Sequence, residues 1–221
     1  LRENEMGALV PSGVRRSDGD PGLPQKVLIL GKCHVRSIAA CWTALRPMDA
    51  VKALTWTNVR KGYDVDGLCD LIGRSTIVVS QADRSGDLSL ADPGLEIARS
   101  ADEIGRITSL LGRAILFPKW SFGGFHPDMA RAYSSAYSML AFAAFTLGLP
   151  KERVVDLYNA YIYASLGYFD EYAKAERHGI EKGQACGLDL ASVVAPNQGR
   201  AFMHSPTQPT IDFWWQVTLL L

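Results

Sequence analysis

Short apolar runs separated by helical patterns organise the first half of the chain. Runs at 26–30, 76–80 and 114–117 are bounded by glycine, proline or polar residues, which is typical of buried strands. Apolar residues recur at helical spacing over 35–46 and again around 97–111. Strands that alternate with helices predict an α/β fold in which helices flank a mainly parallel sheet.

Helical patterns dominate the second half. Apolar stripes of helical period predict one helix over 129–147 and a second over 154–166, and a more polar helix follows at about 170–183. We therefore expect a single α/β domain over residues 25–221, with its sheet in about 25–125 and a helical layer in about 128–221.

The two ends have different character. Residues 1–24 combine prolines, glycines and charges without periodicity, which indicates a flexible leader. They do not have the basic region followed by an apolar stretch that marks a secretory signal. The apolar stretch Ile211–Leu221 is too short to cross a bilayer. It predicts either a helix packed on the core or a partner surface.

Composition excludes some classes of function. The 221 residues include 23 basic and 23 acidic side chains, so the net charge is zero. Neutrality gives no basis for sequence-independent binding of nucleic acid. The four cysteines show no CxxC spacing, and we expect them to be reduced thiols, which favours a cytoplasmic location. The oligomeric state stays open.

The first candidate site is Gly31-Lys32-Cys33-His34, between a strand and a helix. A thiol at the carboxyl end of a parallel strand faces the crevice where open α/β sheets bind ligands. The helix N-terminus and Lys32 would both stabilise the thiolate of Cys33. The alternative is that Cys33 is a small buried residue after a turn. Cys41 and Cys69 lie in apolar stretches and are expected in the core.

The second candidate is the segment Trp120–Asp128, with the sequence WSFGGFHPD. His126 could take and return a proton, and the carboxylate of Asp128 could hold the imidazole, as an activated nucleophile requires. Alternatively, Asp128 only caps the helix expected to begin at Met129.

A third loop, residues 202–210, carries His204 and is punctuated by Pro206 and Pro209. His126 and His204 lack carboxylate partners at ligand spacing, so we expect no metal site. The sequence contains no GxxxxGK[ST] or GxGxxG phosphate loop. His178 lies in the polar helix and is interpreted as a surface residue.

These loops, together with Gln81 after the second strand, give the chain its resemblance to a known family. Taken in order, they resemble the WcbI-type capsular polysaccharide biosynthesis family, whose members are thought to be acetyltransferases that bind coenzyme A. The resemblance covers about residues 26–212, and its most specific part is Gly124-Phe125-His126-Pro127-Asp128. It implies an SGNH-hydrolase-like fold with Cys33 at the position of the nucleophile.

The function that this resemblance implies is transfer of an acetyl group from acetyl-CoA to a sugar hydroxyl of a capsular or exopolysaccharide precursor. His126 or His204 would be the general base. The hydroxyl would attack the thioester directly, or Cys33 would accept the acyl group first. The Gln81 amide and backbone N–H groups near Cys33 would stabilise the oxyanion. The residues expected to bind the coenzyme are Gly31, Lys32, His34, Arg36, Gln81, Lys119 and Arg131.

Two other functions stay open. One is a thiol esterase or hydrolase of the same fold, with water as acceptor. The other is a non-catalytic module that binds coenzyme A or a glycan within a capsule-assembly protein. The chain departs from the family pattern in two places: Lys32 and His34 stand where asparagine and glutamine are common, and Thr207-Gln208-Pro209 stands where Asn-His-Pro is common.

Overall fold

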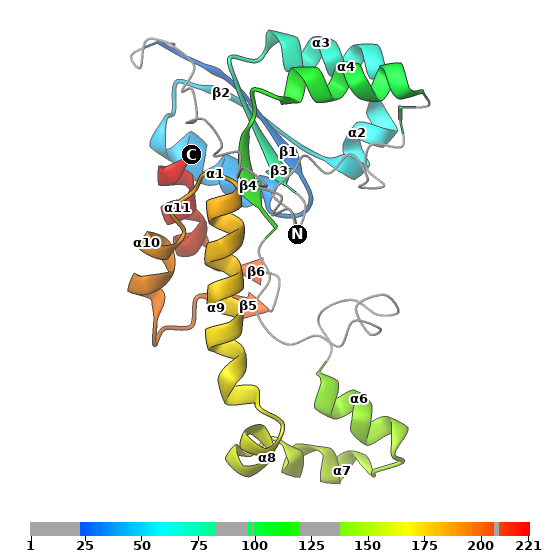
Figure 1. The fold of residues 1–221 in the computed structure, drawn as a ribbon, viewed down its shortest axis with the longest axis vertical. Coiled ribbons are helices and arrows are strands. Elements are labelled where there is room, and N and C mark those ends of the chain that lie inside the picture. Colours follow the sequence, from blue (N-terminus) through cyan, green and yellow to red (C-terminus); the bar gives the residue numbers. More distant parts are fainter. Residues whose placement is uncertain (1–22, 83–96, 99, 120–137, 206–207) are drawn as a thin grey trace, which may run out of the picture.

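A four-stranded parallel sheet lies at the centre of the protein (Figure 1). The structure is a computed structural model, and it describes residues 23–82, 97–98, 100–119, 138–205 and 208–221. The strands are β1 (Lys26–Gly31), β2 (Ala50–Thr55), β3 (Ile77–Ala82) and β4 (Ile115–Pro118), in the order β2-β1-β3-β4. All three pairings are parallel.

Helices connect the strands and continue after the sheet. In the first half these are α1 (Val35–Leu45), α2 (Trp56–Gly62), α3 (Val65–Arg74) and α4 (Ala101–Leu111). In the second half they are α6 (Met139–Thr146), α7 (Lys151–Val154), the short 3₁₀ helix η2 (Val155–Leu157), α8 (Ala160–Ser165), α9 (Tyr168–Ala185), α10 (Ala191–Val194), the 3₁₀ helix η3 (Ala195–Asn197) and α11 (Ile211–Leu220). The antiparallel pair β5 (Met203–Ser205) and β6 (Gln208–Pro209) precedes α11.

The sheet separates two apolar cores. Successive side chains of a strand point to opposite faces. Val27 and Ile29 of β1 therefore pack on one side with α1, α10 and α11, and Leu28 and Leu30 pack on the other side with α2, α3 and α4. All four of these side chains are fully buried. The result is a three-layer sandwich, as the alternating pattern predicts.

The strand order creates a switch point between β1 and β3. The chain leaves β1 through α1 toward β2 on one side of the sheet, and it leaves β3 through α4 toward β4 on the other. In doubly wound sheets, ligands bind in the crevice outside the carboxyl ends of the strands at such a point. The loop after β1 begins at this point.

Three of the four strands of the main sheet are as the sequence predicts. β1, β3 and β4 coincide with the three apolar runs, although β3 continues beyond the run at 76–80 through Gln81 and Ala82. The prediction missed β2, α2 and α3. β2 is an edge strand whose residues are half-buried or exposed, and its sequence AVKALT forms no continuous apolar run.

The predicted single helix over 154–166 is wrong. The chain forms α7 and η2, breaks at Tyr158, and starts again at α8. Asn159 explains the break, because its side-chain oxygen accepts a hydrogen bond from the N–H of Ile162 at 3.0 Å and its amide nitrogen donates to the carbonyl of Asp156 at 2.6 Å. A side chain that satisfies both ends of a break favours two short helices over one long one.

Two other predictions for the second half are confirmed. The polar helix is α9, and α11 packs on the core through Phe213, Trp214 and Val217. Residues 1–22 of the expected leader and 129–137 of the expected first helix lie outside the described residues.

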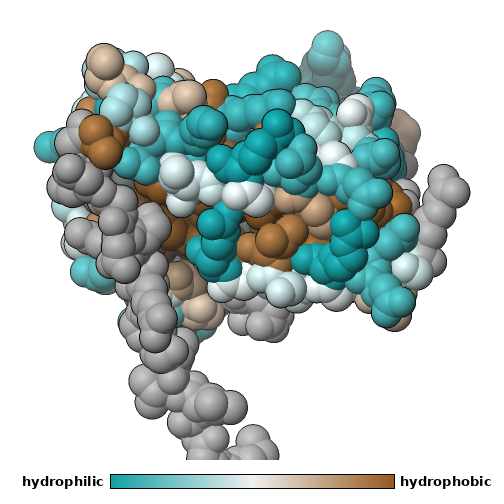
Figure 2. All heavy atoms as spheres, turned by 90° about the horizontal axis from the view of Figure 1, so that it is seen from above, coloured by the Kyte–Doolittle hydropathy of each residue, from teal (hydrophilic) through white to brown (hydrophobic). Residues whose placement is uncertain are grey.

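The segment α6–α8 extends away from the sheet, and α9 connects it to the rest of the molecule (Figure 1). We call residues 138–167, which contain α6, α7, η2 and α8, the helical arm. At the opposite end of the molecule, around α3 and α4, polar side chains cover most of the surface and a band of apolar ones shows between them (Figure 2). Within the described ranges, no helix is both long and apolar enough to cross a membrane.

Candidate functional site

The loop after β1 is held by the side chain of Gln81. β1 and β3 pair in a register that sets Leu30 opposite Ser80, so Gly31 lies beside Gln81. The Oε1 atom of Gln81 accepts a hydrogen bond from the backbone N–H of Lys32 at 2.7 Å. A Cβ atom on Gly31 would lie 2.8 Å from the Cβ of Gln81. The close approach of the two strands therefore requires glycine here.

Cys33 is exposed on this loop. It follows Lys32, whose backbone is fixed by Gln81, and it precedes the first turn of α1, which contains no acidic residue. The alternative that Cys33 is a small buried residue is therefore wrong. An accessible thiol lies at the switch point of the sheet, beside the start of an eleven-residue helix.

Three expected coenzyme contacts are exposed cations. Lys32 precedes Cys33, Arg36 lies in the first turn of α1, and Lys119 directly follows β4. Because the strands are parallel, Lys119 lies at the same carboxyl edge of the sheet as the Cys33 loop, two strands away. The loop after β1 and this edge thus carry positive side chains beside a helix N-terminus, where anions are stabilised.

Two buried polar atoms lie at the carboxyl end of β3. Neither Ser80 Oγ nor Gln81 Nε2 has a hydrogen-bond partner within the part of the chain that the structure describes. An unsatisfied buried donor costs about 1–3 kcal/mol, so such groups often belong to functional sites. The sequence pointed to Gln81 but not to Ser80, which looks like an ordinary small residue in a strand.

His34 lies in the interior, not on the surface of the loop. Only 4% of its surface is exposed, and its ring centroid is 4.7 Å from that of Trp214 on α11. The ring therefore ties the start of α1 to the last helix. The imidazole of His34 therefore does not share the exposure of Lys32 and Cys33.

The remaining predicted residues divide into two groups. His204 is exposed on β5, and Figure 1 shows β5 and β6 on the side of the sheet where the parallel strands end. Phe202, immediately before β5, stacks on Phe213 with centroids 5.5 Å apart, which anchors this strand pair to the core. His126, Asp128 and Arg131 lie outside the described residues.

The other three cysteines are buried, as expected for Cys41 and Cys69. Burial raises the pKa of the Cys41 thiol, and a hydrogen bond with Thr218 opposes this by less. Burial also raises the pKa of Cys69; the charge of Arg106 opposes that rise and the charge of Asp66 adds to it. Both thiols are therefore kept in the protonated, unreactive form.

A separate hollow lies between α2, α3 and α4. Its charged lining includes Arg106 and Asp66, which form an ion pair at 2.7 Å. It contains none of the residues singled out from the sequence. Over the described ranges, no three His, Cys, Asp or Glu side chains are grouped as metal ligands would be.

No protein-family model, curated protein or solved structure shows a significant match to this chain.

Proposed function

We propose that the chain is an acyltransferase that takes an acetyl group from acetyl-CoA at Cys33 and delivers it to a sugar hydroxyl of a capsular or exopolysaccharide precursor. The observation that carries the proposal is the exposed thiol of Cys33, on a loop fixed by Gln81 at the switch point of a doubly wound sheet. This is where open α/β sheets present reactive groups to ligands.

The positive side chains around the thiol support the binding of a coenzyme that carries phosphate groups. Lys32 and Arg36 are exposed on either side of Cys33, and the first turn of α1 has no acidic residue to repel an anion. Lys119 adds a third cation at the same edge of the sheet. Exposed cations of this kind are suited to the phosphate groups of coenzyme A.

The proposed reaction has two balanced steps. The Cys33 thiol first gives its proton to the histidine. The resulting thiolate attacks the acetyl carbonyl carbon, a new S–C bond forms, the bond from that carbon to the coenzyme sulfur breaks, and coenzyme A leaves as its thiol with the proton from the histidine. A sugar hydroxyl then attacks the acetyl group on Cys33 and loses its proton to the neutral histidine, the bond from the carbonyl carbon to the Cys33 sulfur breaks, and Cys33 leaves as the thiolate. His204, exposed on β5, is the described histidine that we assign as base; His126 is its alternative.

The choice of acetyl donor and sugar acceptor rests on the resemblance of the loops to the WcbI-type family. An SGNH-hydrolase-like fold is part of the same proposal. The strand order β2-β1-β3-β4, with the candidate nucleophile after β1, supports it.

The proposal is tested by mixing the protein with acetyl-CoA and measuring intact mass. We expect the wild type to gain the mass of one acetyl group and Cys33→Ala to gain none. Cys186→Ala is the matched control, because it removes a buried thiol, and it should acetylate like the wild type.

Each other outcome has a defined meaning. Coenzyme binding without a mass gain, followed by acetylation of an added sugar, would indicate direct attack and would remove Cys33 as an acyl carrier. Release of acetate without a sugar would indicate a hydrolase. Failure of the wild type to bind acetyl-CoA in calorimetry would refute the proposal.

A further inference from the structure

The helical arm exposes more apolar surface than a monomer in water ordinarily does. Phe145, Leu147, Val155 and Tyr161 are 81%, 77%, 72% and 79% exposed. Tyr158, Leu166 and, just after the arm, Phe169 are also exposed. Together these side chains present roughly 900 Å² to solvent, given about 150–250 Å² for each aromatic ring. This sum is large for the solvated face of a monomer, whose largest single apolar patch is typically about 300–600 Å². We call these seven exposed side chains the apolar patch of the arm.

The composition of α6 shows that this surface is not an ordinary solvated face. The sequence of the helix, MLAFAAFT, contains no charged residue. A helix that is apolar all round is one that other chain segments surround. Yet within the described residues α6 buries Leu140 and Ala144 and leaves Phe145 in solvent.

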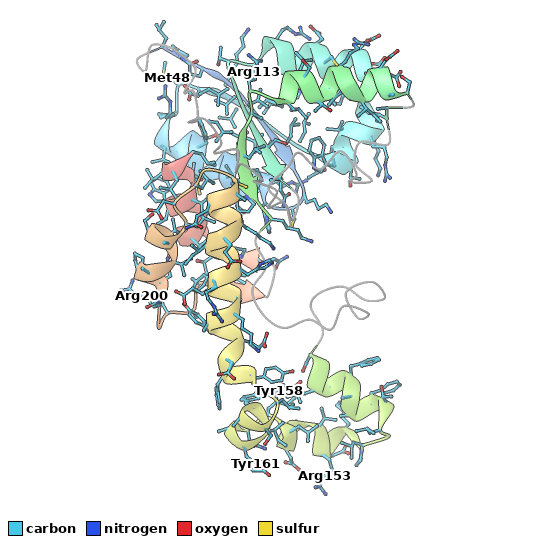
Figure 3. All side chains as sticks on the ribbon, in the orientation of Figure 1. Met48, Arg113, Arg153, Tyr158, Tyr161 and Arg200 are labelled. Atoms are coloured by element: carbon cyan, nitrogen blue, oxygen red, sulfur yellow. The ribbon has the colours of Figure 1, made fainter. Side chains whose placement is uncertain are left out.

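The arm has a defined internal structure that could form one side of an interface. Tyr158 points toward α6, and its hydroxyl donates to Ser138 Oγ at 2.6 Å (Figure 3). The guanidinium of Arg153 pairs with Asp156 at 3.1 Å. Tyr161 points away from the body of the molecule (Figure 3). Exposed aromatic residues beside paired surface charges match the apolar centre and polar rim of protein interfaces.

The charge of this region argues against an anionic partner. The helical arm contains two basic side chains, Lys151 and Arg153, and two acidic ones, Glu152 and Asp156, so its net charge is zero. Membrane surfaces and nucleic acids attract segments rich in lysine and arginine. The available chemistry is instead apolar and aromatic, as in the interfaces of homodimers.

We propose that the helical arm is a dimerisation surface that packs against the arm of a second copy of this chain. Two copies related by a two-fold axis would each bury the same apolar patch. The exposed apolar area on one arm is of the order of the 800 Å² or so that each partner contributes to a stable interface. This proposal is independent of the acyltransferase function.

Sedimentation velocity of the full chain over a range of concentrations tests this. We expect a wild-type dimer, and we expect the double variant Phe145→Ser, Tyr161→Ser to dissociate about 100-fold more readily, as the loss of two aromatic anchors predicts. Met48→Ser is the matched control: Met48 is 76% exposed and lies at the opposite end of the molecule, so this variant should dimerise like the wild type (Figure 3).

Circular dichroism melting of every variant shows whether it folds. A wild type that stays monomeric at about 100 µM would refute the proposal, since stable homodimers form well below that concentration. A monomer in which Phe145→Ser lowers the melting temperature would mean that another part of the same chain covers the patch. A monomer that binds lipid vesicles would mean that a membrane surface, and not a second copy of the chain, covers the patch. A dimer unaffected by the double variant would place the interface elsewhere.

Discussion

The side-chain oxygen of Gln81 accepts a hydrogen bond from the backbone N–H of Lys32 at 2.7 Å, across the boundary between two parallel strands. The residues are 49 positions apart in sequence. This bond fixes the backbone immediately before Cys33. The position of the thiol therefore depends on β3 as well as on its own loop.

Removing the acceptor should loosen the loop. Gln81→Leu replaces the amide with an apolar side chain that is one atom shorter, so the N–H of Lys32 loses the Oε1 acceptor, and we expect hydrogen exchange at Lys32 to be at least 10-fold faster. Hydrogen-exchange mass spectrometry over residues 31–34 measures this. Gln198→Leu, which replaces an exposed glutamine that binds Glu176, should leave the same amides unchanged. Unchanged exchange in Gln81→Leu would mean that Gln81 does not hold the loop.

Substituting Gly31 should destabilise the protein. A methyl group in Gly31→Ala would meet Gln81 Cβ at 2.8 Å and Val35 Cγ1 at 3.0 Å, so we expect a loss of about 2 kcal/mol in the free energy of unfolding. Gly73→Ala is the control, because Gly73 lies in α3 with no atom within 4 Å of the added Cβ. It should stabilise the protein by about 0.5–1 kcal/mol. Urea unfolding compares the two; equal effects would contradict the prediction.

The four thiols should react at different rates. Cys33 is exposed and the other three are buried, so in the native protein we expect one thiol to react rapidly with Ellman's reagent and three to react only after denaturation. Cys33→Ser should remove the rapid phase and leave the slow one. A rapid phase that persists in this variant would show that the thiol of another cysteine is accessible.

Asp49 should make stability depend on pH. Burial raises the pKa of its carboxyl, but hydrogen bonds from Trp42 Nε1, Gln25 N and Arg46 Nε, with the charge of Arg46, lower the pKa by more. The carboxylate therefore contributes stability at pH values above the pKa of unfolded aspartate, about 3.9, and this contribution is lost as the pH falls through the lower folded pKa.

Asp49→Asn tests this contribution. We expect the variant to be about 2 kcal/mol less stable than the wild type at pH 7, because it loses the charge-assisted hydrogen bonds, and this difference should shrink below about pH 4. Urea unfolding at pH 7, 5 and 3 measures it. Asp70→Asn removes an exposed carboxylate paired with Arg74 on α3, so its effect should be within about 0.5 kcal/mol at every pH. A difference for Asp49→Asn that does not change with pH would mean that charge is not responsible.

The strands that could be predicted are those with a continuous apolar sequence. β1 and β3 are such runs because helices cover both sides of them, and β4 keeps the run ILF although it lies at an edge of the described sheet. β2 lies at the other edge, and its sequence AVKALT lacks that signal. α3 carried a readable pattern, since Val65, Leu68, Cys69 and Ile72 recur at helical spacing after the capping residue Asp64. The order of the strands across the sheet could not be predicted, because it depends on pairing between distant segments and not on a local sequence pattern.

The same reasoning explains what was and was not predicted at the site. Cys33 could be singled out because it follows an apolar run at the expected carboxyl edge, and Gln81 could be singled out only through the family resemblance. That Gln81 holds Lys32 could not be predicted, because it depends on β1 and β3 being neighbours. The burial of His34 against Trp214 depends on a helix about 180 residues away in the sequence.

The packing of α11 on α1 has a consequence for folding. The Sγ atom of Cys41 lies 4.0 Å from the carbonyl oxygen of Ile211, a contact that spans 170 residues. One core of the sandwich therefore stays open until α11 has been synthesised. Contacts between residues so distant in sequence slow folding, and the uncovered apolar face of a nascent chain promotes aggregation. During synthesis, this face is where a chaperone would be needed.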